Sequence, residues 1–422
     1  MTTAAGAVPA PGDGGTPEVR ILVTGGGTGG HVSPALAVIG AIREIAPASG
    51  RQPVFRYVGS ENGIESRLAR EAGLSFVGVQ TGKLRRSSRP LGVLSRANFA
   101  DLFRLPVGTI QAARAVAGFR PDVVLATGGY VAVPPVIAAF LLRVPILIHE
   151  QTVQIGLANR IAARFATRIA LTFEGALEEL PPKLRSRAFV TGNPVRPAIF
   201  AGDREAAPAR FGFAPEEDGR VPCIYVTGGA QGARVLNRAV EEALPDLLTL
   251  TRVIHQCGKQ PEGTEQDFDR LQARAAALPE ALQRRYYLTR FVEQDTIGDA
   301  FALADLVVGR SGAGTVTEVS AVGKPTVFVP LVPTGGDEQT RNAMRSVDAG
   351  AAVILPNQWC DGPHLLAEVR ALLSAPERLR KMAEAARTLA RPNAARELAE
   401  ATLALAADAS RRRPASKAAA QR

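Results

Sequence analysis

The chain has 422 residues with a hydrophobic content of 46%, and its formal net charge at pH 7 is +10. This length exceeds what a single hydrophobic core usually serves, so two globular domains are expected. The three cysteines, Cys223, Cys257 and Cys360, lie far apart in no metal-ligand spacing, which argues against a disulfide framework and favours a reducing compartment.

Residues 1–18 lack the basic start and long apolar stretch of a secretory signal, and they are expected to form a disordered leader. Short β-branched runs then alternate with stretches of helical periodicity, which predicts βα units around a parallel sheet. The most apolar window, residues 130–148, contains prolines and Arg143, so it predicts a buried helix and a strand rather than a membrane span. Strands are expected at 19–24, 54–59, 75–80, 122–129, 145–150, 168–173 and 188–194.

The same order of strand, glycine-rich loop and helix begins again at residues 222–244, which indicates one architecture used twice. Further strands are expected at 252–258, 286–292, 305–312 and 326–331. The fold class is therefore predicted as α/β, with two Rossmann-like parallel-sheet domains that face each other across a cleft. The predicted divisions are domains at 19–198 and 199–385, a helical segment at 386–408 that packs back on the first domain, and a disordered basic tail at 409–422.

The stretch "GGGTGGHVSPALAV", residues 25–38, follows the first strand. Gly25, Gly27 and Gly30 fit the G-x-G-x-x-G pattern, in which a helix N-terminus behind a bare backbone binds phosphate. A tight turn alone would explain the same glycines. The dinucleotide version of this motif needs an acidic residue at the end of the second strand, and Glu61 lies past a glycine, which disfavours nicotinamide binding.

Histidines supply candidates for proton transfer. His31 lies where the loop becomes helix, and the positive end of the helix dipole favours its neutral, proton-accepting form. His149 ends a predicted strand on the cleft side, whereas His255 lies inside a strand and is expected in the core. In the second half, "RSGAGT" (310–315) offers a second anion site, with Glu318 one turn into the helix that follows.

No metal site and no cofactor are predicted. Asp267 and Asp269 have the carboxylate-x-carboxylate form of metal-dependent glycosyltransferases, but their stretch predicts a helix, where side chains two apart diverge. They are expected on a solvated helix face. Helix N-termini and arginine side chains, rather than a metal ion, would then stabilise the negative charge of a diphosphate.

Six motifs in order resemble the MurG family of bacterial peptidoglycan glycosyltransferases, which belong to glycosyltransferase family 28 and have the GT-B fold. The resemblance covers about residues 19–405, and its motifs are "GGGTGGHVSPALAV", "DVVLATGGYVAVPP", "PILIHEQ…GLANRIAARFATRIALTF", "VTGNPVR", "VTGGAQGARVLN" and "RSGAGTVTEVSAVGKPTVFVPL…DEQTRNA". It implies inverting transfer of N-acetylglucosamine from UDP-GlcNAc to the C4 hydroxyl of the MurNAc unit of lipid I, which gives lipid II, without a metal for donor binding. It also implies an acceptor- and membrane-side first domain and a UDP-GlcNAc-binding second domain.

Site residues follow from the same resemblance. His31 and Glu318 are the implied catalytic pair, with His31 as candidate base for the acceptor hydroxyl and Glu318 on the ribose. Tyr130 would line the acceptor side. The implied donor-binding residues are Thr28, Gly29, Gly30, Thr152, Arg196, Ala230, Val292, Ala313, Gly314, Thr315, Val316, Thr317 and Gln339.

Three positions depart from the family pattern. Thr152 stands where asparagine is usual, Ala230 where serine is usual, and Glu338 where glutamine is usual. Each lost side-chain hydrogen bond could weaken binding by about 0.5–1.5 kcal/mol. These departures affect the expected donor affinity and sugar selectivity more than the reaction class.

The basic excess matches an anionic partner. Residues 83–108 mix arginine and lysine with leucine, valine and phenylalanine, which favours contact with the anionic cytoplasmic leaflet and a peripheral location on the inner face of the bacterial membrane. An ordinary basic loop and amphipathic helix would have the same composition. Nucleic acid is not expected as a partner, because no zinc-finger, helix-turn-helix or aromatic-rich RNA motif is present. The main alternative is a related nucleotide-sugar transferase that uses another lipid or small-molecule acceptor.

Overall fold

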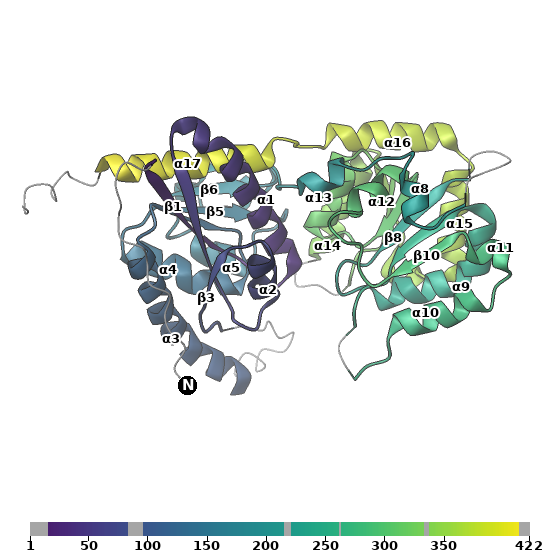
Figure 1. The fold of residues 1–422 in the computed structure, drawn as a ribbon, viewed down its shortest axis with the longest axis horizontal. Helices are drawn as coiled ribbons and strands as arrows, with labels where there is room; N and C mark the ends of the chain where they lie inside the picture. The colour runs from purple at the N-terminus through teal and green to yellow at the C-terminus, as the bar shows by residue number, and fades with distance from the viewer. Residues whose placement is uncertain (1–15, 83–95, 215–220, 261–262, 333–336, 413–422) are drawn as a thin grey trace, which may run out of the picture.

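The computed structural model describes residues 16–82, 96–214, 221–260, 263–332 and 337–412, with the backbone alone for 96–103 and 412. Two α/β units lie side by side, each built on a parallel sheet (Figure 1). Residues 1–15 of the predicted leader, 83–95 of the predicted membrane segment and 413–422 of the predicted tail lie outside the described residues.

The first sheet has the strand order β3-β2-β1-β4-β5-β6-β7. Every recorded pairing in it is parallel, as the βα alternation predicts. Its strands are β1 (Glu18–Thr24), β2 (Gln52–Gly59), β3 (Ser75–Gly78), β4 (Val123–Ala126), β5 (Ile146–Glu150), β6 (Arg168–Leu171) and β7 (Ala188–Val190).

The second sheet has the order β10-β9-β8-β11-β12-β13 and is also parallel. Its strands are β8 (Cys223–Thr227), β9 (Arg252–Gln256), β10 (Tyr286–Thr289), β11 (Leu306–Gly309), β12 (Thr326–Phe328) and β13 (Ala352–Ile354). The predicted strands all occur, and β13 is an additional edge strand that the sequence analysis missed. The α/β fold class with two parallel sheets is thus confirmed.

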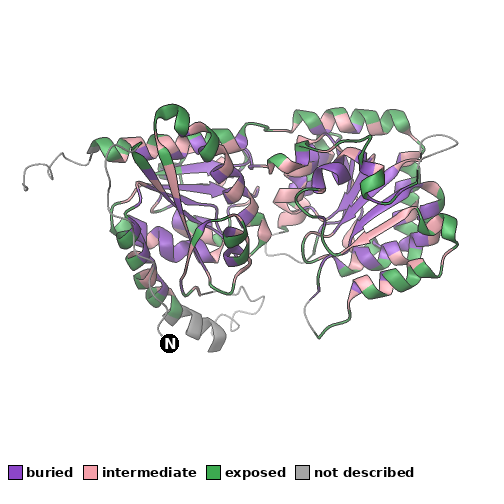
Figure 2. Cartoon of the chain, in the orientation of Figure 1, coloured by how far each residue is buried: buried purple, intermediate pink, exposed green. Residues whose placement is uncertain are grey.

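Helices cover both faces of each sheet, and the buried residues form layers between sheet and helices (Figure 2). Those of the first unit are α1 (Gly29–Ile45), α2 (Ile64–Glu71), α3 (Arg96–Phe119), α4 (Val133–Leu141), α5 (Leu157–Ala162), α6 (Ala176–Glu179) and α7 (Pro182–Arg185). The later ones are α8 (Ala207–Arg210), α9 (Arg234–Leu250), α10 (Asp267–Ala276), α11 (Glu280–Gln283), α12 (Ile297–Leu303), α13 (Ala313–Ala321), α14 (Glu338–Asp348), α15 (Gly362–Leu373), α16 (Pro376–Thr388) and α17 (Ala394–Arg412).

The chain returns to the first unit at its end. Helix α16 covers the second unit, and α17 lies along the first unit, where it contacts α1, β1, β4 and β5 (Figure 1). Leu398, Ala399 and Ala406 of α17 are buried in the core that it shares with α1.

In each sheet, the glycine-rich loops lie where the order of the strands reverses. This strand order is the feature that positions them. It changes direction between β1 and β4 in the first sheet and between β8 and β11 in the second. The loops that leave the carboxyl ends of neighbouring parallel strands on the two sides of such a switch diverge and leave a crevice. The loops at 25–28 and 127–129 flank the first switch, and those at 228–233 and 310–312 flank the second.

Candidate active site

At the first three glycines of the loop, side chains of the protein occupy the space that a Cβ would need. A Cβ on Gly25 would lie 2.0 Å from Thr127 Oγ1, one on Gly26 would lie 2.4 Å from Glu65 Cδ, and one on Gly27 would lie 2.7 Å from the Tyr130 ring. Internal packing therefore explains these three positions, in place of the ligand contact that the motif suggested.

Two buried side chains hold this loop in place. Glu65, which is fully buried, accepts hydrogen bonds from Gly27 N–H through Oε2 and from Ser60 N–H through Oε1, both at 3.0 Å. The Tyr57 hydroxyl donates to Gly25 O at 2.6 Å, and burial together with Glu65 raises the pKa of this phenol. Sequence reasoning missed Glu65, because nothing local separates it from the other acidic residues of its helix.

The end of the same loop is open. A Cβ on Gly29 would meet no atom within 4 Å, and one on Gly30 only Thr28 Oγ1 at 3.6 Å. Helix α1 begins at Gly29 with no acidic residue in its first turn, and the first turn closes with a bond from His31 N–H to Thr28 O. The preceding N–H groups therefore form the positive end of a helix that an anion can approach.

His31 lies in the first turn of α1 and is half-buried. Its Nδ1 lies 2.6 Å from Gln151 Oε1 and 3.1 Å from Thr127 O. The hydroxyl of Thr127 donates to the backbone oxygen of His31 at 2.7 Å. The loops after β1, β4 and β5 thus meet at this ring.

The other two candidate histidines are structural. His149 is fully buried, with Nε2 at 3.0 Å from Gly192 O, and burial lowers its pKa to about 4. It lies near the carboxyl end of β5, as predicted, but its side chain is enclosed by the protein. His255 lies in the core as predicted, between Tyr286 and Asn237, and burial lowers its pKa to about 3.

The second half provides a matching helix end. Gly312 is the N-cap of α13, and neither Gly312 nor Gly314 has an atom within 4 Å of an added Cβ. The bond from Val316 N–H to Gly312 O opens the helix, so the N–H groups of the three residues before Val316 are available to an anion. Val316 itself is buried, which leaves only its backbone for a ligand.

Arg196 and Glu318, both predicted at the donor site, pair with each other. Arg196 donates through Nε at 3.2 Å and Nη2 at 2.9 Å to Glu318 Oε1, and about a fifth of each side chain is exposed. Beside them, Asn193 Nδ2 lies 3.5 Å from Thr317 Oγ1, which also donates to Ala313 O. The linker after β7 is thereby tied to the first turns of α13.

Among the remaining predicted residues, Val292, Thr152 and Ala230 lie in loops, whereas Gln339 is the second residue of α14. Gln339 Oε1 accepts from Leu331 N–H at 2.9 Å, and Val292 N–H donates to Gln256 Oε1 at 3.0 Å. The backbone carbonyl of Val292, rather than its N–H, is therefore the group available to the nucleobase of the donor. The hydroxyl of Thr152 donates to Glu150 Oε1 at 2.8 Å. Ala230, in the loop after β8, is exposed.

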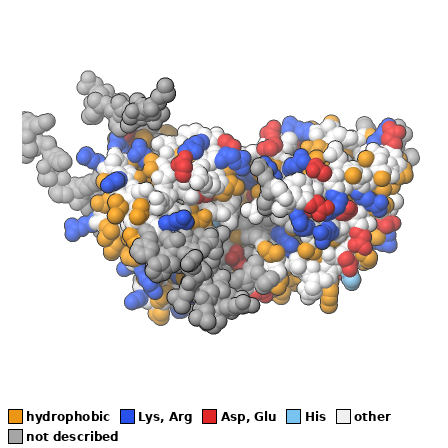
Figure 3. Space-filling view, turned by 90° about the horizontal axis from the view of Figure 1, so that it is seen from below, with side chains coloured by type: hydrophobic (Ala, Val, Ile, Leu, Met, Phe, Trp, Pro, Cys, Tyr) orange, Lys and Arg blue, Asp and Glu red, His pale blue; other side chains and the backbone are white. Residues whose placement is uncertain are grey.

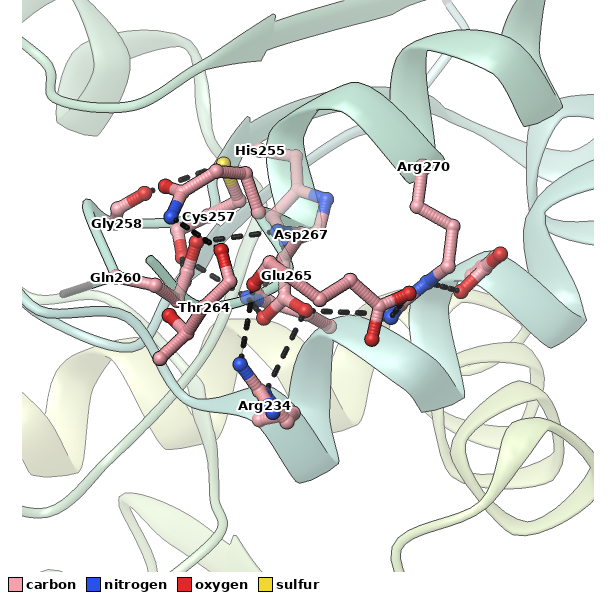
Figure 4. A network of polar contacts seen from close by, with 12 residues as sticks. Arg234, His255, Cys257, Gly258, Gln260, Thr264, Glu265, Asp267 and Arg270 are labelled. Atoms are coloured by element: carbon pink, nitrogen blue, oxygen red, sulfur yellow. Dashed lines mark hydrogen bonds and ion pairs between the residues drawn. The ribbon is translucent and has the colours of Figure 1, made fainter. Parts of the chain in front are cut away.

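The acidic pair at 267 and 269 corrects one expectation. Asp267 is fully buried, where its Oδ2 accepts from Asn237 at 2.7 Å and its Oδ1 from Arg270 at 3.1 Å (Figure 4). The predicted solvated face is wrong for this residue and applies only to Asp269, which pairs with Arg290 on the surface. Within the described parts of the chain, no group of three His, Cys, Asp or Glu residues could hold a metal ion.

Models of two known domains match the chain. The glycosyltransferase family 28 N-terminal domain matches residues 21–171, and the family 28 C-terminal domain matches residues 223–400. The chain belongs to glycosyltransferase family 28. The first match runs from within β1 to the end of β6, and the second contains β8 to β13. The family resemblance stated from the motifs is confirmed.

Relatives in family 28 extend over most of the chain. A protein of Salinibacter ruber is 38% identical over 87% of this chain and 91% of its own length, and one of Halothermothrix orenii is 33% identical over 87% and 94%. Both are named UDP-N-acetylglucosamine--N-acetylmuramyl-(pentapeptide) pyrophosphoryl-undecaprenol N-acetylglucosamine transferase.

Solved structures agree with this assignment. The crystal structure of Acinetobacter baumannii MurG superimposes with a TM-score of 0.66 at 28% identity, over 92% of this chain and 99% of that one. A UDP-GlcNAc 2-epimerase from Neisseria meningitidis shares the fold alone, with a TM-score of 0.58 at 14% identity over 92% of this chain and 100% of that one.

Proposed function

We propose that the chain transfers N-acetylglucosamine from UDP-GlcNAc to the C4 hydroxyl of the MurNAc unit of lipid I, with inversion, and so forms lipid II. The family-28 relatives that carry this activity in their names support the reaction class. The observation that carries the proposal is the pair of helix N-termini whose glycines, Gly29 and Gly314 among them, face open space. Such ends bind a diphosphate without a metal ion.

Each helix end has a proposed role in the reaction. His31 takes the proton from the C4 hydroxyl as its oxygen attacks C1 of the donor sugar, and UDP leaves. Charge that develops on the diphosphate is stabilised by the N–H groups at the start of α13 and by Arg196, while Glu318 binds the ribose. General-base help contributes about 10²–10⁴-fold, and positioning with charge stabilisation supplies the rest.

Release of UDP from UDP-GlcNAc, with and without a lipid I analogue, tests this proposal. Release that needs the analogue and falls at least about a hundredfold in His31→Ala supports both the transferase and its base. Release that needs the analogue but survives the substitution contradicts the role of His31. Binding of UDP-GlcNAc without release in the presence of the analogue contradicts lipid I as acceptor and favours another lipid or small molecule.

The proposal also includes peripheral contact with the anionic cytoplasmic leaflet, where lipid I would be reached. Helices α3 and α4 pack together, and the exposed apolar side chains Val107, Ile110, Phe140, Leu141 and Leu142 lie on or just after them. Exposed arginines at 104, 114 and 143 accompany them, and Figure 3 shows hydrophobic and basic side chains interspersed over this unit. None of the described helices is long and apolar enough to cross a membrane.

Vesicle sedimentation tests the membrane contact. The double variant Ile110→Ser with Leu141→Ser is expected to lose at least about tenfold in affinity for vesicles that contain phosphatidylglycerol, because two apolar anchors are removed. The matched control is Val332→Ser, an exposed apolar position in the second unit. Equal binding of the double variant and the control would contradict the contact.

A further inference from the structure

The ring of His31 is flanked on one side by atoms that only accept hydrogen bonds. Gln151 Nε2 lies 2.6 Å from Thr127 O. A backbone carbonyl is an acceptor, so the amide nitrogen of Gln151 must face Thr127 and its amide oxygen must face the histidine. His31 Nδ1 therefore has two acceptors, Gln151 Oε1 at 2.6 Å and Thr127 O at 3.1 Å.

Two acceptors on one ring nitrogen determine the tautomer. A neutral imidazole carries one hydrogen, and on His31 that hydrogen must lie on Nδ1, since a lone pair there would face two other oxygen lone pairs. Nε2 then keeps its lone pair. Within the described part of the chain, Nε2 of His31 has no hydrogen-bond partner in the protein.

We propose that Gln151 is a positioning residue that holds His31 as the Nδ1–H tautomer and so makes Nε2 the atom that accepts the proton. This inference rests on the proposed function, in which His31 is the base. Gln151 acts through the histidine and needs no contact with either substrate.

The surroundings of these two side chains are closely packed. Gln151 is 2% exposed and Thr127 is fully buried. A Cβ on Gly128 would lie 3.3 Å from His31 Nδ1, and one on Gly129 would lie 3.2 Å from His31 Cδ2, so the backbone of this loop packs directly against the ring. A ring flip that exchanged the two nitrogens would break both hydrogen bonds of Nδ1.

A neutral amide at this position also suits a base that works near neutral pH. A carboxylate at the same distance would attract the imidazolium form of the ring by its charge. The amide of Gln151 orients the ring without adding charge.

Nitrogen-15 NMR of histidine-labelled protein tests the proposal without relying on activity. Wild type is compared with Gln151→Met, which keeps the chain length and removes both polar atoms, and His31→Gln assigns the signal. The matched control is Gln52→Met, at an exposed glutamine of β2. We expect the Nδ1–H form in wild type and control, and a mixture of tautomers in Gln151→Met.

Kinetics then show whether the tautomer matters for the reaction. Gln151→Met is expected to lower kcat by at least about tenfold, with KM for UDP-GlcNAc within about twofold of wild type, since only the orientation of the base is lost. An Nε2–H form in wild type overturns the proposal, and this result needs no variant to fold. A tautomer unchanged in Gln151→Met also overturns it. A tautomer shift with kcat unchanged in both Gln151→Met and His31→Gln supports the control by Gln151 and overturns the proposed base instead.

Discussion

Glu338 places a negative charge where the MurG family usually has a neutral glutamine. It is the first residue of α14, and burial, with Glu150 as a second cause, raises the pKa of its carboxyl group. A raised pKa in the folded state means that the charged form destabilises the fold. This effect is absent below the usual carboxyl pKa and complete above the raised one.

Replacement of Glu338 by glutamine is therefore expected to raise the melting temperature at pH 7–8 and to leave it unchanged near pH 4. Scanning calorimetry of the variant and wild type at both pH values measures this difference. The exposed Glu384, changed to glutamine, is the matched control. An equal shift at both pH values would show that packing, not charge, explains the effect.

At the scale of the element, the first glycine loop divides into a packed half and an open half. Ala at position 26 would collide with the buried carboxylate of Glu65 and break its bonds to the loop, so Gly26→Ala is expected to destabilise the protein by about 1–3 kcal/mol. Gly29→Ala adds a methyl group in open space at a helix start, so its stability is expected to stay within about 0.5 kcal/mol of wild type.

In donor binding, the same two variants are expected to differ in the reverse sense, with Gly29→Ala as the variant whose function changes. If the donor approaches the open half, Gly29→Ala raises KM for UDP-GlcNAc by about tenfold while folding normally. Urea unfolding and initial-rate kinetics on both variants measure the two effects. Wild-type kinetics in Gly29→Ala would place the ligand elsewhere.

The local sequence pattern predicts helices and strands better than it predicts which distant residues contact them. The β-branched runs before glycines are strong signals, and the strands found there follow from them. The edge strand β13 was missed because only three residues, Ala352–Ile354, form it. Glu65, Thr127 and Gln151 could not be assigned from the sequence, because each acts on a loop or ring that lies 38–120 residues away along the chain.

At the scale of the whole molecule, polar contacts join the two units. Arg391 pairs with Glu174 at 3.4 Å, and the guanidinium of Arg345 lies 4.3 Å from the centre of the Phe173 ring. Gly192, at the start of the linker, has a φ of 90° and no room for a Cβ beside Arg391. Contacts of this kind expose little apolar surface when they break, which is typical of units that can move relative to each other.

The buried histidines make the stability of the molecule sensitive to acid. The pKa of His149 is lowered to about 4 and that of His255 to about 3, so both stay neutral in the fold, whereas the unfolded chain protonates them near pH 6.5. The unfolded state therefore binds more protons below pH 6.5, and stability falls as the pH drops toward the folded values. Two such groups lower the free energy of unfolding by up to about 2.7 kcal/mol per pH unit.

His255→Gln tests this origin of the acid sensitivity, because its amide can bond Asn237 and Tyr286 without titrating. Its free energy of unfolding is expected to be lower than that of wild type at pH 7. Between pH 6 and pH 4 this free energy should fall less steeply with pH than in wild type, because the unfolded variant takes up about one proton fewer. Urea unfolding followed by circular dichroism across this range gives the slopes, with the exposed His364→Gln as control. Parallel slopes for the three proteins would show that His255 is not a source of the acid sensitivity.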